Sequence, residues 1–269
     1  MTAADLSSLP ITLREAINGL MASPHVQGIL LVGSRSRGFQ EEGSSDHDLE
    51  LVVDDAFAKE LEPLARLSLL WDGVPFQSRL LGDIFTYSRS EIEAKATSLL
   101  DVDHWPYEAA QLWYDRDGEI APLIARLAHF PEGEWETRLK LHYVDFWTHT
   151  ARAITIAARE STLNRALVLG RAAQGYMRCV FVLNRRWPPL PHWAEQALEQ
   201  SALTLRPAND IALLNEALTT LNPEPLKELH DALDPLLDDL GFGWHRERLP
   251  LLVELFGPES EAVRQRWLR

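Results

Sequence analysis

Two short stretches decide what fold and site are expected of this chain: Gly33-Ser34-Arg35-Ser36-Arg37-Gly38 and, a few residues later, Ser45-Asp46-His47-Asp48-Leu49-Glu50-Leu51. The first is a glycine-serine turn after Val26–Val32, whose Val, Ile and Leu residues predict a buried strand. The second leads into another predicted strand, Leu49–Val53. Because alternate side chains of a strand share a face, Asp46 and Asp48 are expected to project together, with His47 turned away.

The acid pair and the turn together predict a site for a phosphorylated ligand and magnesium. Two neighbouring carboxylates repel each other, and a bound divalent cation removes that repulsion. Mg²⁺ usually binds through one or two carboxylates and the phosphates of a substrate. The turn offers backbone N–H groups and the Ser34 hydroxyl to phosphate oxygens, and Arg35 and Arg37 add positive charge. Each feature alone is a weak signal, and the alternative is a surface turn followed by solvated acids.

The combination of strand, Gly33-Ser34, cationic turn, Asp46-x-Asp48 and strand resembles the signature of the polymerase-β-like nucleotidyltransferase superfamily. The sharp part of the resemblance covers residues 29–53. The helical half, through Asn184–Pro189, is similar to the C-terminal bundle of uncharacterised bacterial members and, more broadly, of aminoglycoside and lincosamide nucleotidyltransferases.

This resemblance implies magnesium-dependent transfer of a nucleoside monophosphate to a hydroxyl of an unidentified acceptor, with release of pyrophosphate. ATP, as the usual donor among relatives, implies transfer of AMP. Asp46 and Asp48 would be the catalytic metal ligands. The residues implied to bind the nucleotide are Gly33, Ser34, Arg35 and Ser45.

The third carboxylate that members of the superfamily usually carry on a neighbouring strand is not evident. The strand expected next to the acid pair, Val74–Leu81, contains no acid. Asp72 and Asp83 flank it, and Glu50 shares the face of the acid pair on its own strand. If none of them serves, the alternative is a degenerate, non-catalytic nucleotide-binding protein.

The pattern along the chain predicts two domains of different class. An α/β (α+β) nucleotidyltransferase-like domain is expected over 1–130, and an all-α helical bundle over 131–269. In the first domain, helices are expected over Leu13–Met21 and 55–70, and a further strand over Ala110–Tyr114.

Composition limits the partners. The net charge of −14 argues against broad binding to nucleic acid and leaves a small-molecule acceptor as the better expectation. A basic antibiotic fits this charge, but only weakly. The single cysteine, Cys179, permits no intrachain disulfide and is expected in the core. The chain begins without a signal-like segment and its apolar runs look too short to span a bilayer, so a cytoplasmic protein without membrane contact is expected.

Polar stripes in the helical half have two interpretations each. His142, Asp145, His149 and Arg152 share a helix face, which is expected to be solvated, with one or two ion pairs. The alternative is a wall of an active-site cleft with Asp145 or a histidine as general base. The seven-residue repeat of arginines, favoured as surface charge, could instead bind phosphate; it comprises Arg171, Arg178 and Arg185.

Two further alternatives concern single features. A toxin–antitoxin-type regulatory protein would carry Arg-x4-6-His in the bundle, whereas Arg138 and His142 are one residue too close. Trp105 could stack on a nucleotide base, although burial in the core is expected for most of the nine tryptophans.

Overall fold

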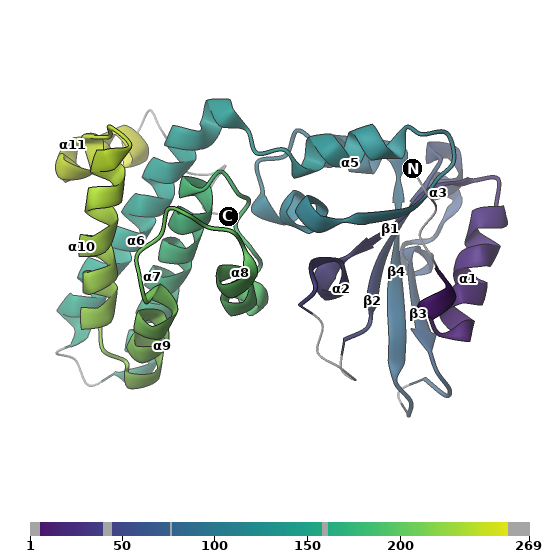
Figure 1. The fold of residues 1–269 in the computed structure, drawn as a ribbon, viewed down its shortest axis with the longest axis horizontal. Helices are drawn as coiled ribbons and strands as arrows, with labels where there is room; N and C mark the ends of the chain where they lie inside the picture. The colour runs from purple at the N-terminus through teal and green to yellow at the C-terminus, as the bar shows by residue number, and fades with distance from the viewer. Residues whose placement is uncertain (1–5, 40–44, 76, 158–160, 258–269) are drawn as a thin grey trace. The chain divides into compact units, whose positions relative to one another are not determined.

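The computed structural model describes residues 6–39, 45–75, 77–157 and 161–257. The chain divides into two compact units (Figure 1). The sheet unit comprises Met1–Ser98 and Val102–His129, and the helical unit comprises Leu99–Asp101 and Phe130–Arg269. The predicted fold class, an α+β domain followed by an all-α bundle, is confirmed.

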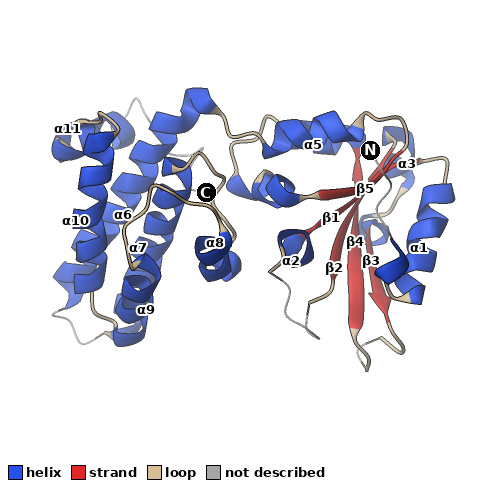
Figure 2. Cartoon of the chain, in the orientation of Figure 1, coloured by secondary structure: helices blue, strands red, loops and turns tan. Residues whose placement is uncertain are grey.

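The sheet unit contains a five-stranded sheet with helices on its two faces (Figure 2). Its strands are β1 (Val26–Val32), β2 (His47–Val53), β3 (Leu67–Trp71), β4 (Leu80–Ser88) and β5 (Gln111–Asp115). Its α-helices are α1 (Ile11–Ala22), α2 (Gly33–Arg37), α3 (Asp55–Glu60), α4 (Arg89–Lys95) and α5 (Ile120–Ala128). Its 3-10 turns are η1 (Leu6–Ser8), η2 (Pro63–Arg66) and η4 (Trp105–Ala109), while η3 (Asp101–Asp103) contributes Asp101 to the helical unit.

The strand order is β3-β4-β2-β1-β5. β2 runs parallel to β4, and the other neighbouring pairs are antiparallel. On one face, Leu49 and Leu51 of β2 pack with α1 residues such as Leu13. On the other face, Val52 packs with α5 residues such as Leu123. The residues of β2 with the parity of Val52, which include Asp48, therefore belong to the α5 face.

Two predictions for the middle of this unit are wrong. The segment 55–70 is not one helix, because Pro63 cannot continue the α3 helix; η2 follows and then β3. The strand expected over 74–81 begins only at Leu80 and extends to Ser88. Phe76 of that segment lies outside the described residues. This shift places Asp83 inside a strand, which matters for the site.

The helical unit is built around a long antiparallel pair, α6 and α7, which approach closely at Gly175, where a Cβ would lie 2.8 Å from the Phe146 nitrogen. Its α-helices are α6 (Trp135–Ala157), α7 (Thr162–Leu183), α8 (Ala194–Gln200), α9 (Asp210–Thr220), α10 (Glu224–Asp239) and α11 (Arg248–Phe256). Its 3-10 turns are η5 (Glu132–Glu134), η6 (Pro191–Trp193) and η7 (Trp244–Arg246).

The apolar runs of the chain were expected to be too short to span a bilayer. By length and composition alone, however, α7 could cross one. More than half of that window is buried inside the protein, as in a core helix. Cys179 lies in it, fully buried, and burial raises the pKa of its thiol to about 12. A thiol held in this protonated state is a core side chain, as expected.

Candidate nucleotide and metal site

The glycine-serine turn and the acid pair lie against each other. Gly33 ends β1 and begins α2 with a φ of +70°, a conformation that favours glycine. A Cβ placed on Gly33 would lie 2.6 Å from the Asp48 Cγ and 2.9 Å from its Cβ. Only a residue without a side chain leaves room here for the Asp48 carboxylate. The close approach expected from the sequence is therefore present in the fold.

A third carboxylate, Asp83 of β4, joins this pair. Asp48 and Asp83 are direct partners in the parallel β2–β4 register, so their side chains project from the same sheet face. Gly82 permits the close approach of the two strands, because a Cβ there would lie 2.6 Å from the His47 carbonyl oxygen. Sequence reasoning named Asp83 only as a flanking acid, because the strand was expected to end at Leu81.

The pKa of Asp83 reflects its acidic neighbours. The pKa of Asp83 is raised to about 6, first by burial and then by the negative charges of Asp48 and Asp46. The Asp83 Oδ1 atom is buried and has no hydrogen-bond partner among the described residues. A buried acceptor beside two further carboxylates is the environment in which a bound cation relieves the most repulsion.

The residues present fit magnesium together with a phosphorylated substrate rather than a metal site made by the protein alone. Among the described residues, no group of three or more His, Cys, Asp or Glu side chains is arranged to enclose a metal ion. Mg²⁺ keeps several ligand positions for water and substrate phosphate, so one or two carboxylates suffice. Asp46 and Asp48 remain the predicted ligands, and Asp83 is the acid that joins them.

Asp46 lies immediately before β2, at a loop end that Arg35 holds. The Arg35 Nε donates to the Asp46 carbonyl oxygen at 2.8 Å, and its Nη2 donates to the Ser45 carbonyl oxygen at 2.6 Å. Arg79 Nη2 also donates to the Ser45 carbonyl, at 3.2 Å. Arg35 thus fixes the entry into β2, which positions Asp46. Direct contact of Arg35 and Ser45 with a nucleotide stays a prediction.

The remaining residues of the turn are well ordered by α2. Ser34 is buried, and its carbonyl oxygen accepts from the Phe39 N–H at 2.9 Å. Ser36 Oγ donates to the Gly33 carbonyl oxygen at 2.9 Å. The first N–H groups of any helix have no partner within it, so those of α2 are potential donors to phosphate. Phosphate binding by Gly33 and Ser34 stays a prediction.

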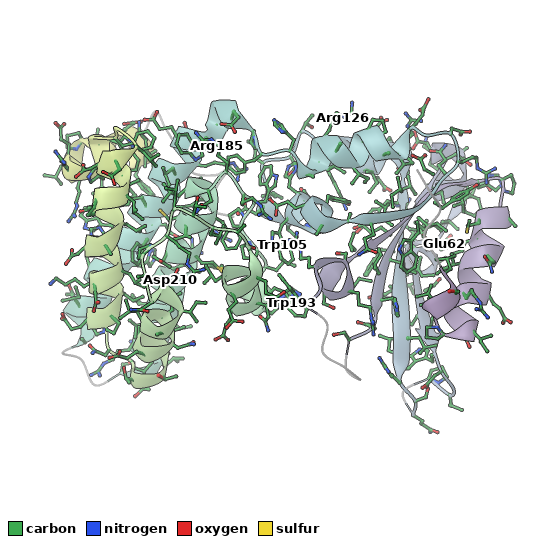
Figure 3. The ribbon with its side chains drawn as sticks, in the orientation of Figure 1. Glu62, Trp105, Arg126, Arg185, Trp193 and Asp210 are labelled. Atoms are coloured by element: carbon green, nitrogen blue, oxygen red, sulfur yellow. The ribbon has the colours of Figure 1, made fainter. Side chains whose placement is uncertain are left out.

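Arg37 and Trp105 have a structural role. The Arg37 guanidinium lies 3.8 Å from the centroid of the Trp105 ring and donates to the Trp105 carbonyl oxygen. Trp105, labelled in Figure 3, is 1% exposed. With one ring face covered by a cation and the rest buried, this indole packs in the core instead of offering a surface for a base.

His47 points away from the acids, as expected. Its Nδ1 lies 2.9 Å from the Leu81 carbonyl oxygen, and its ring packs near Trp113 on the α1 face. Burial, ahead of the nearby charges, lowers the pKa of His47. His47 is thus a neutral support between β2 and β4.

Glu50 shares the face of Asp48 but is committed to other partners. It is buried, Tyr107 Oη donates to its Oε2 at 2.6 Å, and Lys95 Nζ lies 3.6 Å from its Oε1. Burial, opposed by the Lys95 charge, raises its pKa. Asp72 is also engaged, because its carboxylate accepts from the Arg79 N–H at 2.8 Å. Asp83 is therefore the best-placed third acid.

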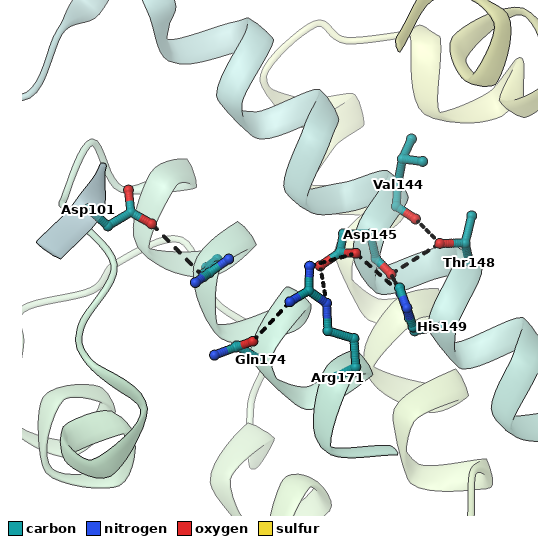
Figure 4. Close-up of polar contacts among 8 residues, drawn as sticks. Asp101, Val144, Asp145, Thr148, His149, Arg171 and Gln174 are labelled. Atoms are coloured by element: carbon teal, nitrogen blue, oxygen red, sulfur yellow. Dashed lines mark hydrogen bonds and ion pairs between the residues drawn. The ribbon is translucent and has the colours of Figure 1, made fainter. Parts of the chain in front are cut away.

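The polar stripe of the helical unit forms a second cluster between α6 and α7 (Figure 4). Asp145 of α6 is 5% exposed. Its Oδ1 lies 3.2 Å from His149 Nδ1, and its Oδ2 lies 3.2 Å from Arg171 Nε of α7. Burial is outweighed by the His149 hydrogen bond and the Arg171 charge, so the pKa of Asp145 is lowered. The solvated face expected here is wrong for Asp145, which ties two helices together.

His142 and Arg138 are buried in the same helix pair. Arg138 donates to the Asp101 carboxylate and the Leu99 carbonyl oxygen, each at 2.7 Å. His142 is 1% exposed, and burial, with nearby arginines, lowers its pKa to about 3. Both side chains are enclosed, which disfavours an accessible Arg–His site of the toxin type.

The three repeated arginines of α7 and its C-terminal end are all paired with acids. Besides the Arg171–Asp145 pair, Arg178 lies 3.9 Å from Asp101, and Arg185, labelled in Figure 3, lies 2.9 Å from Glu132. These carboxylates already balance the positive charge, which disfavours a phosphate-binding stripe.

Comparisons with known proteins match part of the chain to a domain of unknown function and show likeness to solved structures. The family described as "Domain of unknown function (DUF4037)" matches residues 105–194, about a third of the chain. The fold is similar to that of a nucleotidyltransferase-like protein from Exiguobacterium sibiricum, with 16% identity and a TM-score of 0.45. That alignment covers 95% of this chain and 79% of the other. No curated protein matches.

Proposed function

We propose that this chain is a magnesium-dependent nucleotidyltransferase that moves AMP from ATP to a hydroxyl of a small-molecule acceptor and releases pyrophosphate. The observation that carries the proposal is the convergence of Gly33, Asp48 and Asp83 at one end of the three central strands of the sheet. A glycine turn whose backbone N–H groups could bind phosphate thus adjoins a cluster of acids whose mutual repulsion a cation would relieve.

Asp46 and Asp48 would hold the magnesium. When bound, Mg²⁺ supplies charge neutralisation to the triphosphate and its leaving group. The backbone N–H groups of Gly33 and Ser34 would bind the β and γ phosphates, which orients the α phosphorus toward the acids. Arg35 keeps Asp46 in place through the two carbonyl contacts of its loop. Positioning and electrostatic stabilisation are the main sources of rate in such transfers.

Asp83 would act as the general base. Its carboxylate projects from the same sheet face as that of Asp48, so it would stand beside the reacting groups and could take up the hydroxyl proton. The acceptor oxygen bonds to the α phosphorus while the bond from that phosphorus to the bridging oxygen of pyrophosphate breaks. The hydroxyl proton passes to the Asp83 carboxylate, and pyrophosphate carries away the electron pair of the broken bond.

The non-catalytic alternative was motivated by the missing third acid. Asp83 occupies a position that could supply it, so that motive is removed. The regulatory alternative depended on an Arg-x4-6-His motif in the bundle, whereas Arg138 and His142 are one residue too close and are also buried. We therefore keep the enzyme as the proposal.

Two measurements test this function. Calorimetry should detect ATP binding that requires Mg²⁺ and that weakens strongly in Asp46→Asn. Pyrophosphate release from each nucleoside triphosphate should depend on Mg²⁺ and rise when a suitable hydroxyl acceptor is added. ATP binding that is indifferent to Mg²⁺, or turnover that survives Asp46→Asn, would contradict the proposal.

A further inference from the structure

An exposed apolar strip lies beside the acids on the same face of the sheet. In the antiparallel β3–β4 register, Leu69 faces Asp83 and Leu67 faces Phe85, so all four side chains project from the Asp83 side. Leu67 is 40% exposed, and Leu69 and Phe85 are each 43% exposed. We call Leu67, Leu69 and Phe85 the apolar strip. It begins next to Asp83, near the start of β4, and runs toward the C-terminal end of that strand.

The order of the strands separates the strip from the phosphate-binding turn. The turn follows β1, Asp48 stands on β2, Asp83 stands on β4, and the strip spans β4 and β3. A ligand that reaches across this face meets the turn first, then the two acids, then the strip. The acids thus stand between the two binding surfaces.

If the proposed function holds, in-line displacement requires the glycine turn and the apolar strip to bind different parts of the reacting pair. The attacking oxygen must approach the α phosphorus from the side opposite the leaving pyrophosphate. With pyrophosphate held at Gly33, the acceptor comes from the β4–β3 side, past Asp83. We propose that the apolar strip binds the body of the acceptor, and that the natural acceptor is a hydroxyl compound with an apolar or aromatic body.

A hollow at the far end of the strip supports an apolar body. It measures about 310 Å³, and its lining includes Pro63, Arg66, Leu67, Phe85, Tyr87 and Lys95. β3 pairs with β4 only as far as Phe85, and the hollow lies at that point, where residues of η2 and α4 complete its lining. A volume of this size accommodates a ring or a short alkyl chain.

The cations that line this hollow are already balanced. Arg66 Nη1 lies 2.6 Å from Glu91 Oε1, and Lys95 Nζ lies 3.6 Å from Glu50 Oε1 and 3.9 Å from the Tyr87 ring centroid. Besides these ion pairs, which include Glu91, and Thr86, the lining consists of Pro63, Leu67, Phe85 and Tyr87. Recognition here would come from apolar contact, which disfavours a polycationic antibiotic as the acceptor.

Alkyl glucosides test this inference, because they present the same hydroxyls with apolar tails of chosen length. The full chain, with ¹³C-methyl leucine, Mg²⁺ and α,β-methylene-ATP, is titrated with methyl β-D-glucoside, hexyl β-D-glucoside or kanamycin. We expect the hexyl compound to shift the methyl resonances of Leu67 and Leu69 and to bind about tenfold more tightly than the methyl compound. Each methylene that the strip covers should add up to about fourfold in affinity.

Matched variants assign the effect to the strip. Leu69→Thr/Phe85→Thr places a β-branched residue, which strands favour, in each strand and should remove the preference for the hexyl tail while nucleotide binding persists. Ile11→Thr, at a 64% exposed position of α1, should leave the preference unchanged. Equal binding of both glucosides, a preference that survives the double substitution, or stronger shifts with kanamycin would overturn the inference. If the unsubstituted protein shows no Mg²⁺-dependent nucleotide binding, the proposed function itself is contradicted.

Discussion

Asp145 of the helical unit is buried and Asp83 of the sheet unit is half-buried with its Oδ1 atom shielded from water, and their charges are handled in opposite ways. Asp145 has Arg171 and His149 against it, and its pKa is lowered. Asp83 has two further acids near it, and its pKa is raised to about 6. A buried carboxylate with cationic partners holds a fold together, whereas one that stands among other acids favours a bound cation. The contrast separates structural acids from site acids.

The largest expected effect comes from removing one charge of the acid cluster. Asp48→Asn should lower pyrophosphate release on the order of 10³-fold and abolish Mg²⁺-dependent ATP binding, because the amide is a poor magnesium ligand. Release is measured with saturating ATP and Mg²⁺. Asp117→Asn, in an exposed turn of the same unit, is the matched control and should retain full activity. An active Asp48→Asn enzyme would erase the distinction between the two acid clusters.

Two glycine substitutions separate backbone strain from steric contact with the site. Gly33→Ala and Gly38→Ala both place a side chain at positive φ, +70° and +75°, which costs about 1–2 kcal/mol. Only at Gly33 would the new Cβ meet Asp48, while at Gly38 no atom lies within 4 Å. Both variants should unfold at lower urea concentrations. Only Gly33→Ala should also weaken Mg²⁺–ATP binding, by tenfold or more, which corresponds to about 1.4 kcal/mol of binding free energy. Equal binding losses would show that strain in α2, not contact with Asp48, controls the site.

The helical cluster should respond in stability rather than in ligand binding. Asp145→Asn leaves Arg171 and His149 without their anion, and because Arg171 is partly exposed we expect a loss of about 1–3 kcal/mol in the free energy of unfolding. Mg²⁺–ATP binding should not change. Arg152→Gln, at an exposed position of the same helix, should stay within about 0.5 kcal/mol of the unsubstituted protein. A loss of turnover with unchanged stability would assign Asp145 to the site after all.

The smallest expected effect is a gain, and not a loss, in the free energy of unfolding for Asp83→Asn without magnesium. The pKa of Asp83 is higher in the folded protein than its ordinary value of 3.8, so its ionisation destabilises the fold. That penalty is absent below about pH 4, grows as the pH rises toward 6 and is complete above it. The amide should therefore stabilise the apoprotein by about 1–2 kcal/mol at pH 8 and by nearly nothing at pH 4. Urea titrations of both proteins at the two pH values measure the difference.

With magnesium and ATP added, the unsubstituted protein should become more stable than Asp83→Asn. They stabilise the protein that binds them by mass action, and the unsubstituted acid cluster binds better. If Asp83→Asn were less stable than the unsubstituted protein at pH 8 in chelator, the carboxylate would have a structural partner like that of Asp145, and the comparison would fail.

Short-range patterns were enough to predict the core of the site. The strand Val26–Val32 was predicted with its observed bounds, and β2 begins two residues before the predicted Leu49. Glycine at position 33 follows from the need for positive φ, and the outward turn of His47 follows from strand alternation. These features depend on neighbouring residues, so a linear sequence contains them.

Longer-range features could not be read in the same way. Helical spacing in 55–70 concealed η2 and β3, since Leu67–Trp71 is extended only because it pairs with β4. The pairing of Arg171 with Asp145 depends on how α6 packs on α7, and nothing in either stripe alone identifies it.

The sequence by itself determined the glycine-serine turn, the acid pair and the change from mixed α/β pattern to helices, because each depends on residues within a few positions of one another. Only the tertiary structure decided which acid joins the pair. Asp83 is distant from Asp48 in sequence and meets it solely through the parallel hydrogen-bond register of β2 and β4. That register is fixed by side-chain packing on both faces of the sheet, a property of the assembled core.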